Sequence, residues 1–528
     1  MTKTWRDALL VLLAGLVLAL LVSAPYALGA LKPAAGWEFT GFLIAAEDGN
    51  SYLSTMLQGA QGRWSFQIVY TTEPHQGALF FLFYLLLGKL ARLFGLSPAL
   101  ALHLSRVVLI PLALYSFWRM AVYLCRRQAA ARLATALLAL AGGLGWLWVL
   151  LGGTTELERM PVDLWVPDAS FFLSALTFPH LVLKQGLLFL FIIEALRFVE
   201  RGGRRPALLA MLAGLGASLI HPYTLPVIGV PLGMFVLWRA RRERRLLWSG
   251  IGRLALVAAP SLPYVAYSLW VFQTNPVFRS WQAQNTLYSP PPHLYLLGFG
   301  LLTPLALVGL LARQPEGRPH PFVAVWFVVI PLLLYVPYVM QRRFLDGYQA
   351  PLVILAAAGI LYLLGRLRSR RLQTWVAAGL GLPLVLTNVL LLAGALATAS
   401  QPQEPAYRPA WEMQAVRWFR GIPGYPTVMG SYLTGNLLPA QAPARAFVGH
   451  GPETMNSDAK IALAERFYDA LSADEWRSSL LAQYGIDYVY HGPRERALGA
   501  FEPAQAPYLH LVYDNGIVQI YRVQEAAQ

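Results

Sequence analysis

The segment Glu47-Asp48-Gly49-Asn50-Ser51-Tyr52 follows shortly after the first long apolar stretch of the chain, Leu9–Leu28. That stretch is long enough for a helix to cross the hydrocarbon core of a bilayer. Apolar runs of similar length recur up to about residue 398 and then stop. The acidic pair Glu47 and Asp48 is therefore expected just outside the first membrane span of a protein with many spans.

The composition excludes an ordinary soluble protein, because 56% of the residues are hydrophobic and only 13% are charged. The net charge of +15 does not indicate nucleic-acid binding, since most arginines lie in short loops between apolar runs. The single cysteine, Cys125, excludes an internal disulfide. Met1–Arg6 and the run after it resemble a signal peptide, but the run is long for one, so we interpret it as an uncleaved first span.

The apolar segments predict a bundle of about eleven transmembrane helices. Their approximate bounds are 8–30, 99–124, 132–151, 172–197, 206–222, 224–239, 250–272, 294–312, 321–340, 348–365 and 374–397. The first outer loop, 32–98, is predicted to hold two helices that lie in the membrane interface, at about 48–61 and 77–94. Treating the second as a span would place Arg126 and Arg127 outside and break the charge pattern.

Basic residues are concentrated in alternate loops, which by the positive-inside rule face the cytoplasm. We therefore predict a multi-pass protein of the inner (plasma) membrane with a cytoplasmic N-terminus and a tail on the outer side. The basic loops contain Lys3 and Arg6; Arg126, Arg127 and Arg132; Arg201, Arg204 and Arg205; Arg239, Arg241, Arg242, Arg244 and Arg245; Arg313 and Arg318; and Arg366, Arg368, Arg370 and Arg371.

The tail after Ser400 changes in composition and is long enough for a small domain. Helices are predicted at Arg408–Arg420, Ile461–Leu471 and Ala473–Tyr484, and strands at Asp487–Tyr490, His510–Tyr513 and Ile517–Val523. The turn Asp514-Asn515-Gly516 joins the last two strands as a hairpin. The predicted fold class is thus an all-α polytopic membrane bundle, residues 1–399, followed by a small extracytoplasmic α/β domain, residues 400–528.

Asp48 is the first candidate for chemistry, as a general base for an acceptor hydroxyl or as a metal ligand. The alternative is a helix N-cap, a position that aspartate favours. Glu47 is its neighbour and the second candidate. Glu73-Pro74-His75 could bind a divalent ion or position a phosphate, or could simply cap the interfacial helix that follows.

Two histidines beside prolines lie at predicted outer membrane edges, His180 and His221, and His75 maps to the same side. Ionisable residues in spans indicate function by default, and three histidines on one side favour a shared cavity, although their spacing is unlike that of a zinc motif. Asp168 is the acid in the outer loop that lies closest to the fourth span.

The pair Arg342 and Arg343 breaks the positive-inside pattern at the outer end of a span. The guanidinium fork suits phosphate oxygens, and a lipid phosphate of the outer leaflet is the natural ligand. The alternative is a pair that anchors the helix among lipid head groups in general.

The layout of the chain resembles that of the GT-C glycosyltransferases. It consists of a first span, an outer loop with an acid before an interfacial helix, a second interfacial helix and a helical bundle. Short motifs are similar to those of a bacterial branch close to mannosyl- and aminoarabinose transferases. These motifs are Asp48–Tyr52 through Gly59, Gly62 and Trp64; Glu73–Leu79; Gly435–Pro439; Val448–His450; Glu453-Thr454; and Tyr484–Val489.

The resemblance implies a cell-envelope enzyme that transfers a sugar from a polyprenyl-phosphate carrier to a lipid, glycan or protein acceptor on the outer side, usually with inversion. Asp48 matches the family's catalytic acid, Glu47-Asp48 its adjacent acids, and Asp168 a second acidic position. Some relatives need a divalent metal such as Mg or Mn, but nothing in this sequence requires one.

Two other classes of function fit the same residues. A transporter or flippase of a lipid-linked saccharide would use the outer acids, histidines and arginines for binding, although no internal duplication supports it. A non-catalytic membrane subunit would present its tail to a partner.

Overall fold

The computed structural model of the chain describes residues 3–244, 248–312 and 318–524. These residues form two compact units, each made of three stretches of sequence. The first unit runs up to Ala24 and continues with His103–Ser268 and Leu287–Ala395. The second unit consists of Pro25–Leu102, Leu269–Thr286 and the chain from Leu396 onward. The independent folding of residues 400–528 remains a prediction.

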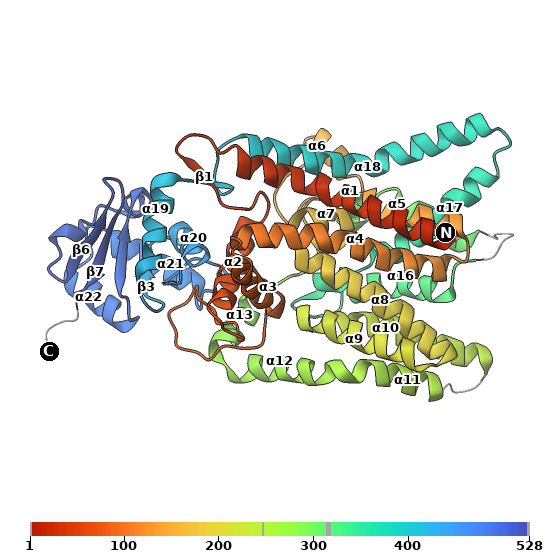
Figure 1. Ribbon diagram of the computed structural model, residues 1–528, viewed down its shortest axis with the longest axis horizontal. Helices are drawn as coiled ribbons and strands as arrows, with labels where there is room; N and C mark the ends of the chain where they lie inside the picture. Colours follow the sequence, from red (N-terminus) through yellow and green to blue (C-terminus); the bar gives the residue numbers. More distant parts are fainter. Residues whose placement is uncertain (1–2, 245–247, 313–317, 525–528) are drawn as a thin grey trace. The chain divides into compact units, whose positions relative to one another are not determined.

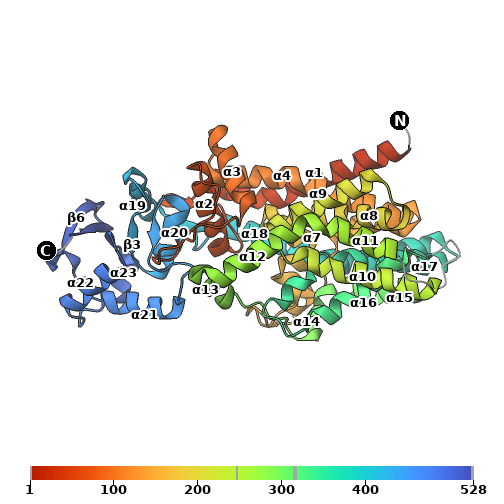
Figure 2. The same ribbon diagram turned by 90° about the horizontal axis from the view of Figure 1, so that it is seen from below.

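The first unit is a helical bundle, whose helices are labelled in Figures 1 and 2. The helices that lie wholly or mostly in it are α1 (Lys3–Leu31), α4 (Pro98–Cys125), α5 (Gln128–Leu140), α6 (Gly145–Leu150), α7 (Phe171–Thr177), α8 (Pro179–Arg201), α9 (Arg204–Ile220), α10 (Thr224–Glu243), α11 (Trp248–Ala258), α12 (Leu262–Thr274), α14 (Pro292–Phe299), α15 (Leu302–Leu311), α16 (Pro321–Leu333), α17 (Gln349–Gly365) and α18 (Arg370–Ser400).

Every apolar segment predicted to span the membrane contains one or two of these helices, which confirms the helical assignment. Within the described ranges, six helical segments are long and apolar enough to cross a membrane. A seventh is added if α14 and α15, which are bent by 84° at Gly300-Leu301, count as one span. The number of helices that actually cross the membrane stays a prediction.

Two prolines define the helix ends that carry the candidate histidines. Pro179 is the first residue of α8, where its missing N–H costs no hydrogen bond, so His180 lies in the first turn of that helix. Pro222 disfavours helical backbone in the residue before it. His221 accordingly leaves the helix with φ −137° and ends α9.

The second unit contains helices and short strands, labelled in Figure 1. Its helices are α2 (Ala46–Ala60), α3 (Leu82–Leu93), α13 (Pro276–Gln284), α19 (Ala410–Trp418), α20 (Tyr432–Gln441), α21 (Ser457–Tyr468), α22 (Asp474–Gln483) and α23 (Pro493–Leu498). Its strands are β1 (Trp37–Phe39), β2 (Tyr407–Pro409), β3 (Thr427–Met429), β4 (Arg445–Ala446), β5 (Tyr488–His491), β6 (Leu509–Asp514) and β7 (Gln519–Val523).

Five strands form one mixed sheet in the order β4-β3-β5-β7-β6. The pairs β3–β4 and β3–β5 are parallel, whereas β5–β7 and β6–β7 are antiparallel. The predicted hairpin between β6 and β7 is confirmed, and Gly516 has the positive φ that this turn requires. Two buried clusters, centred on Phe467 and on Phe419, form the core of the tail.

The first outer loop and the tail belong to the same compact unit. Strand β1 pairs with β2 in antiparallel register, with Glu38 opposite Arg408. Both predicted loop helices are present as α2 and α3, but α3 begins at Leu82 rather than near 77. Residues 76–81 instead form an irregular segment in which Ala78 pairs with Phe66.

Candidate active site

The acidic pair Glu47 and Asp48 lies in the first turn of α2. The N-cap of this helix is Ala45, which has φ 50° and makes no side-chain cap. The expectation that Asp48 caps the helix is therefore wrong, because the helix starts two residues earlier than predicted. Carboxylates in a first turn still interact favourably with the helix dipole, so both acids stabilise this end of α2.

Glu47 is held by groups from the tail. Its Oε1 accepts hydrogen bonds from the Tyr432 hydroxyl and from the N–H of Gly451, the latter at 3.2 Å. The N–H of Gly451 also reaches the Tyr432 oxygen at 2.8 Å. Burial, followed by the hydrogen bond to Glu47, raises the pKa of Tyr432. Glu47 is thus fixed in place, whereas the side chain of Asp48 is 57% exposed.

His450 pairs with Asp48, with its Nε2 3.6 Å from Asp48 Oδ1. The imidazole is almost completely buried. Behind it lies Glu453, which is also buried and accepts a hydrogen bond from the Ser51 hydroxyl of α2. Three carboxylates, those of Glu47, Asp48 and Glu453, therefore surround one imidazole.

The charges of this cluster set its protonation. Burial alone would lower the pKa of His450, but Glu453, Asp48 and Glu47 together raise it to about 9. Burial raises the pKa of Glu453, and His450 and Ser51 offset part of that increase. At neutral pH, His450 is consequently an imidazolium ion that pairs with the exposed Asp48 carboxylate.

Buried hydrogen bonds fix the surroundings of the cluster. Asn50 of α2 donates to Asn436 of α20 at 2.8 Å, and the Tyr70 hydroxyl donates to the Asn436 carbonyl at 3.2 Å. Thr454 in turn donates to the Tyr70 carbonyl at 2.8 Å. Residues from the first loop and from the tail therefore hold α2 and the segment 450–454 in register, which pre-organises Asp48.

Glu73 and His75 already have protein partners. Glu73 Oε2 accepts from Lys460 Nζ at 2.7 Å and from the Thr71 hydroxyl. Burial opposes ionisation, yet these bonds lower the pKa of Glu73. His75 Nδ1 donates to the Glu73 carbonyl at 2.9 Å, and its Nε2 accepts from the N–H of Ile68 at 3.1 Å. Both ring nitrogens shape the loop, so ligand binding by His75 would require these bonds to break.

The first unit contains a second polar cluster, centred on Lys184 in α8, which is fully buried. Lys184 Nζ lies 2.8 Å from Asp168 Oδ1 and 3.1 Å from Asp346 Oδ2. Arg343 Nη1 contacts the other oxygen of Asp168 at 3.0 Å. Two cations thus balance two carboxylates, and removing any one of them would leave a buried charge unpaired.

His180 and His221 meet beside this cluster, with ring centroids 5.5 Å apart. The Nδ1 of His221 faces Lys184 Nζ at 3.2 Å and the Tyr223 hydroxyl at 2.8 Å. It therefore accepts hydrogen bonds, which leaves the proton of a neutral ring on Nε2. The structure brings together four of the residues that the sequence singled out, namely Asp168, His180, His221 and Arg343.

The two arginines of the predicted pair have different surroundings. Arg343 is paired with buried Asp168. The guanidinium carbon of Arg342 lies 4.4 Å from the centre of the Trp165 ring, and its Nη1 lies 3.5 Å from the exposed carboxylate of Glu158. Arg342 is therefore the better candidate for an incoming phosphate, because its partners in the protein are weaker.

Glu47 already accepts hydrogen bonds from Tyr432 and Gly451, so a divalent metal would have to displace these partners to bind it. Across the part of the chain that the structure describes, no group of three or more His, Cys, Asp or Glu side chains could hold a metal ion.

Sequence reasoning did not select His450, Glu453, Lys184 or Asp346 as site residues. His450 and Glu453 belong to the short motifs that carry the family resemblance, which was a usable signal. Lys184 was detectable as a charged residue inside an apolar segment.

Neither family models nor curated protein sequences match this chain. Several solved structures, however, do match it. The archaeal oligosaccharyltransferase AglB from Archaeoglobus fulgidus, in complex with an inhibitory peptide and a dolichol-phosphate, has a TM-score of 0.56 at 12% identity, over 93% of this chain and 70% of that one. ArnT from Cupriavidus metallidurans, bound to undecaprenyl phosphate, has a TM-score of 0.51 at 13% identity, and the match covers 99% of this chain and 98% of ArnT.

A third similar structure is the arabinofuranosyltransferase AftD from Mycobacteria, with a TM-score of 0.61 at 15% identity. The match covers 100% of this chain but only 42% of AftD. Together these comparisons confirm the resemblance to GT-C glycosyltransferases at the level of the fold.

Proposed function

We propose that this chain is a membrane glycosyltransferase that moves a sugar from a polyprenyl-phosphate donor to an acceptor hydroxyl on the outer side of the membrane. The observation that carries the proposal is the exposed carboxylate of Asp48, paired with a buried histidine at 3.6 Å. The fold supports it, because the similar structures include transferases solved with dolichol-phosphate and undecaprenyl phosphate.

Asp48 serves as the general base in this proposal. As the acceptor oxygen attacks the anomeric carbon, its proton passes to the carboxylate, and the bond from that carbon to the phosphate oxygen breaks. A single displacement of this kind inverts the anomeric configuration. His450 acts as a positioning residue, because its positive charge pairs with the Asp48 carboxylate and orients it.

Within the first unit, and as a separate step of the proposal, we assign the phosphate of the carrier to Arg342, whose guanidinium lies over Trp165. Asp168 and Lys184 position its neighbour Arg343 in a balanced buried network. His180 and His221 border that network and are proposed to line the donor site. Glu73 supports the acidic cluster indirectly, by joining the first loop to the tail through Lys460, and His75 orders that loop through the Glu73 carbonyl and the Ile68 N–H.

Asp48→Asn tests the role of the base directly. We expect transfer by the purified full chain, given polyprenyl-phosphate sugars and a panel of acceptors, to fall by roughly two to four orders of magnitude. Asn keeps the size of the side chain, so the protein should still fold, with a small loss of stability from the lost pairing with His450 and with the helix dipole. Asp458→Asn is the matched control, because Asp458 is also an exposed acid in the first turn of a helix, α21.

The same assay separates the alternatives. Transfer by Asp48→Asn at the parental rate would refute the catalytic role of Asp48. Flipping of the lipid-linked sugar without any transfer would indicate a transporter instead. Arg342→Ala should raise the donor concentration needed for half-maximal rate; an unchanged value would remove Arg342 from the donor site.

A further inference from the structure

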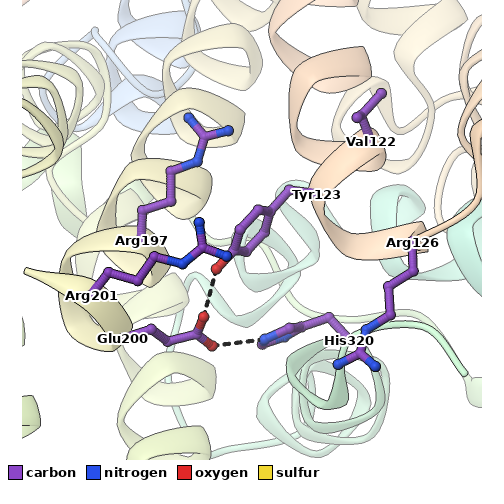
Figure 3. A pocket seen from close by; sticks show the side chains of 7 residues that line it. All are labelled: Val122, Tyr123, Arg126, Arg197, Glu200, Arg201 and His320. Atoms are coloured by element: carbon purple, nitrogen blue, oxygen red, sulfur yellow. Dashed lines mark hydrogen bonds and ion pairs between the residues drawn. The ribbon is translucent and has the colours of Figure 1, made fainter.

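A cavity of about 460 Å³ lies in the first unit at the C-terminal end of α8 (Figure 3). Sixteen residues of α8 separate Lys184 from Glu200, a rise of about 24 Å along the helix. The cavity is therefore separate from the Lys184 cluster. Its polar lining consists of Tyr123, Arg126, Arg197, Glu200, Arg201 and His320.

Three guanidinium groups dominate the charge of this cavity. Arg197 and Arg201 lie one turn apart on α8, with their guanidinium carbons 5.4 and 5.6 Å from the centre of the Tyr123 ring. Figure 3 shows Arg201 extending from α8 toward Tyr123, with Arg126 across the cavity and Arg197 directed back along α8. Arg197 also contacts Glu194 at 3.0 Å, so its charge is partly balanced.

The carboxylate of Glu200 is already engaged inside the cavity. It accepts from the Tyr123 hydroxyl at 2.5 Å and from His320 Nε2 at 2.8 Å (Figure 3). These two bonds tie together α4, α8 and the start of α16, and they direct the carboxylate toward His320. The arginines are thus left as the groups with which a ligand can pair, and that ligand must be an anion.

The backbone at Arg126 supports a role for its side chain. Helix α4 ends at Cys125, and Arg126 follows with φ 59°. Glycine is the usual residue in this left-handed position, because a Cβ is unfavourable there. An arginine at a position that favours glycine brings a third guanidinium to the rim of the cavity.

The depth of the cavity indicates where the anion comes from. Pro98–Cys125 is apolar and long enough to span a membrane, and Arg126 follows it directly. The cavity therefore lies at the level of lipid head groups, at the end that the positive-inside rule assigns to the cytoplasm. Basic pockets between helices on that side suit the phosphates of anionic lipids.

We propose that Arg126, Arg197 and Arg201 form a binding site for the phosphate of an anionic phospholipid of the cytoplasmic leaflet. The guanidinium forks bind the phosphate oxygens, and Tyr123 with Glu200 and His320 forms the rigid floor. The site is independent of the proposed glycosyl transfer, and it ties the ends of α4, α8 and α16 to one lipid.

The test measures lipid retained by the purified full chain. The protein in neutral detergent is offered phosphatidylglycerol or phosphatidylcholine, and bound lipid is counted by native mass spectrometry. We expect phosphatidylglycerol to bind more tightly by about tenfold or more. Arg126→Gln/Arg197→Gln/Arg201→Gln should remove this preference. The matched control is Arg204→Gln/Arg205→Gln/Arg241→Gln, which loses the same charge from exposed positions outside the cavity. This control should keep the preference for phosphatidylglycerol.

If the triple variant misfolds, the single variant Arg126→Gln still tests the proposal, because Arg126 is exposed and its replacement should not disturb the fold. Arg126→Gln should weaken phosphatidylglycerol binding severalfold. Equal binding of the two lipids by the parental protein, or an unchanged preference in the folded triple variant, would overturn the proposal. Displacement of phosphatidylglycerol by inorganic pyrophosphate at low concentration would overturn the lipid assignment in favour of a soluble phosphate.

Discussion

At the scale of the residue, His450 shows how a cluster of carboxylates controls one side chain. Its pKa in the folded protein is about 9, against 6.5 for an unperturbed histidine. The stability that this shift contributes is complete below pH 6.5 and is lost as the pH rises through about 9. We predict that the thermal unfolding midpoint falls across this window, and that His450→Gln flattens the fall. Scanning calorimetry at several pH values measures the unfolding midpoint of both proteins.

His510→Gln is the matched control for this titration, because His510 is an exposed histidine of the same unit, on β6. His510→Gln should leave the pH dependence of the thermal unfolding midpoint as it is in the parental protein. The carboxylates of Glu47, Asp48 and Glu453 also face the imidazole. Burial raises the pKa of Glu453, so the part of the slope that Glu453 contributes persists in the variant. A slope that is the same with and without His450 would show that the imidazole is neutral in the folded protein.

At the scale of the element, α2 and α3 form the frame that carries Asp48. They cross where two glycines meet: a Cβ on Gly88 would lie 1.9 Å from the Met56 carbonyl oxygen, and one on Gly59 would lie 2.1 Å from that of Leu85. We predict that Gly88→Ala lowers stability by about 1–3 kcal/mol, because the backbones must separate. Thermal unfolding of the purified protein measures this loss.

Gly421→Ala is the control for this crossing, since no atom lies within 4 Å of a Cβ there and the residue belongs to the same unit. Its effect should stay within about 0.5 kcal/mol. If Gly88→Ala were equally mild, the two helices could not pack as closely as the structure has them.

At the scale of the whole molecule, the distribution of basic residues predicts the orientation in the membrane. Arg201 ends α8, Arg204 and Arg205 begin α9, and the turn between these two helices is expected in the cytoplasm. A reporter that is active only in the cytoplasm should be silent when fused after Gln528 and active when inserted after Gly203. An active reporter after Gln528 would reverse the predicted side of the tail and of the acidic cluster.

The sequence by itself determined the features that depend on local pattern. Apolar runs of helical length are found as helices, because burial and backbone hydrogen bonding within a segment need no distant partner. The tail strands β5, β6 and β7 and the turn at Gly516 were predictable for the same reason. The short strands β3 and β4 were not, because two or three residues carry too little periodicity.

Only the tertiary structure decided which distant residues meet. Asp48 faces His450, and Ser51 bonds to Glu453, across about four hundred residues of chain. Likewise, Lys184 joins Asp168 to Asp346 in a network that no spacing in the sequence records. Charge pairing of this kind depends on how helices pack, and packing is set by the shapes of whole surfaces rather than by any local pattern.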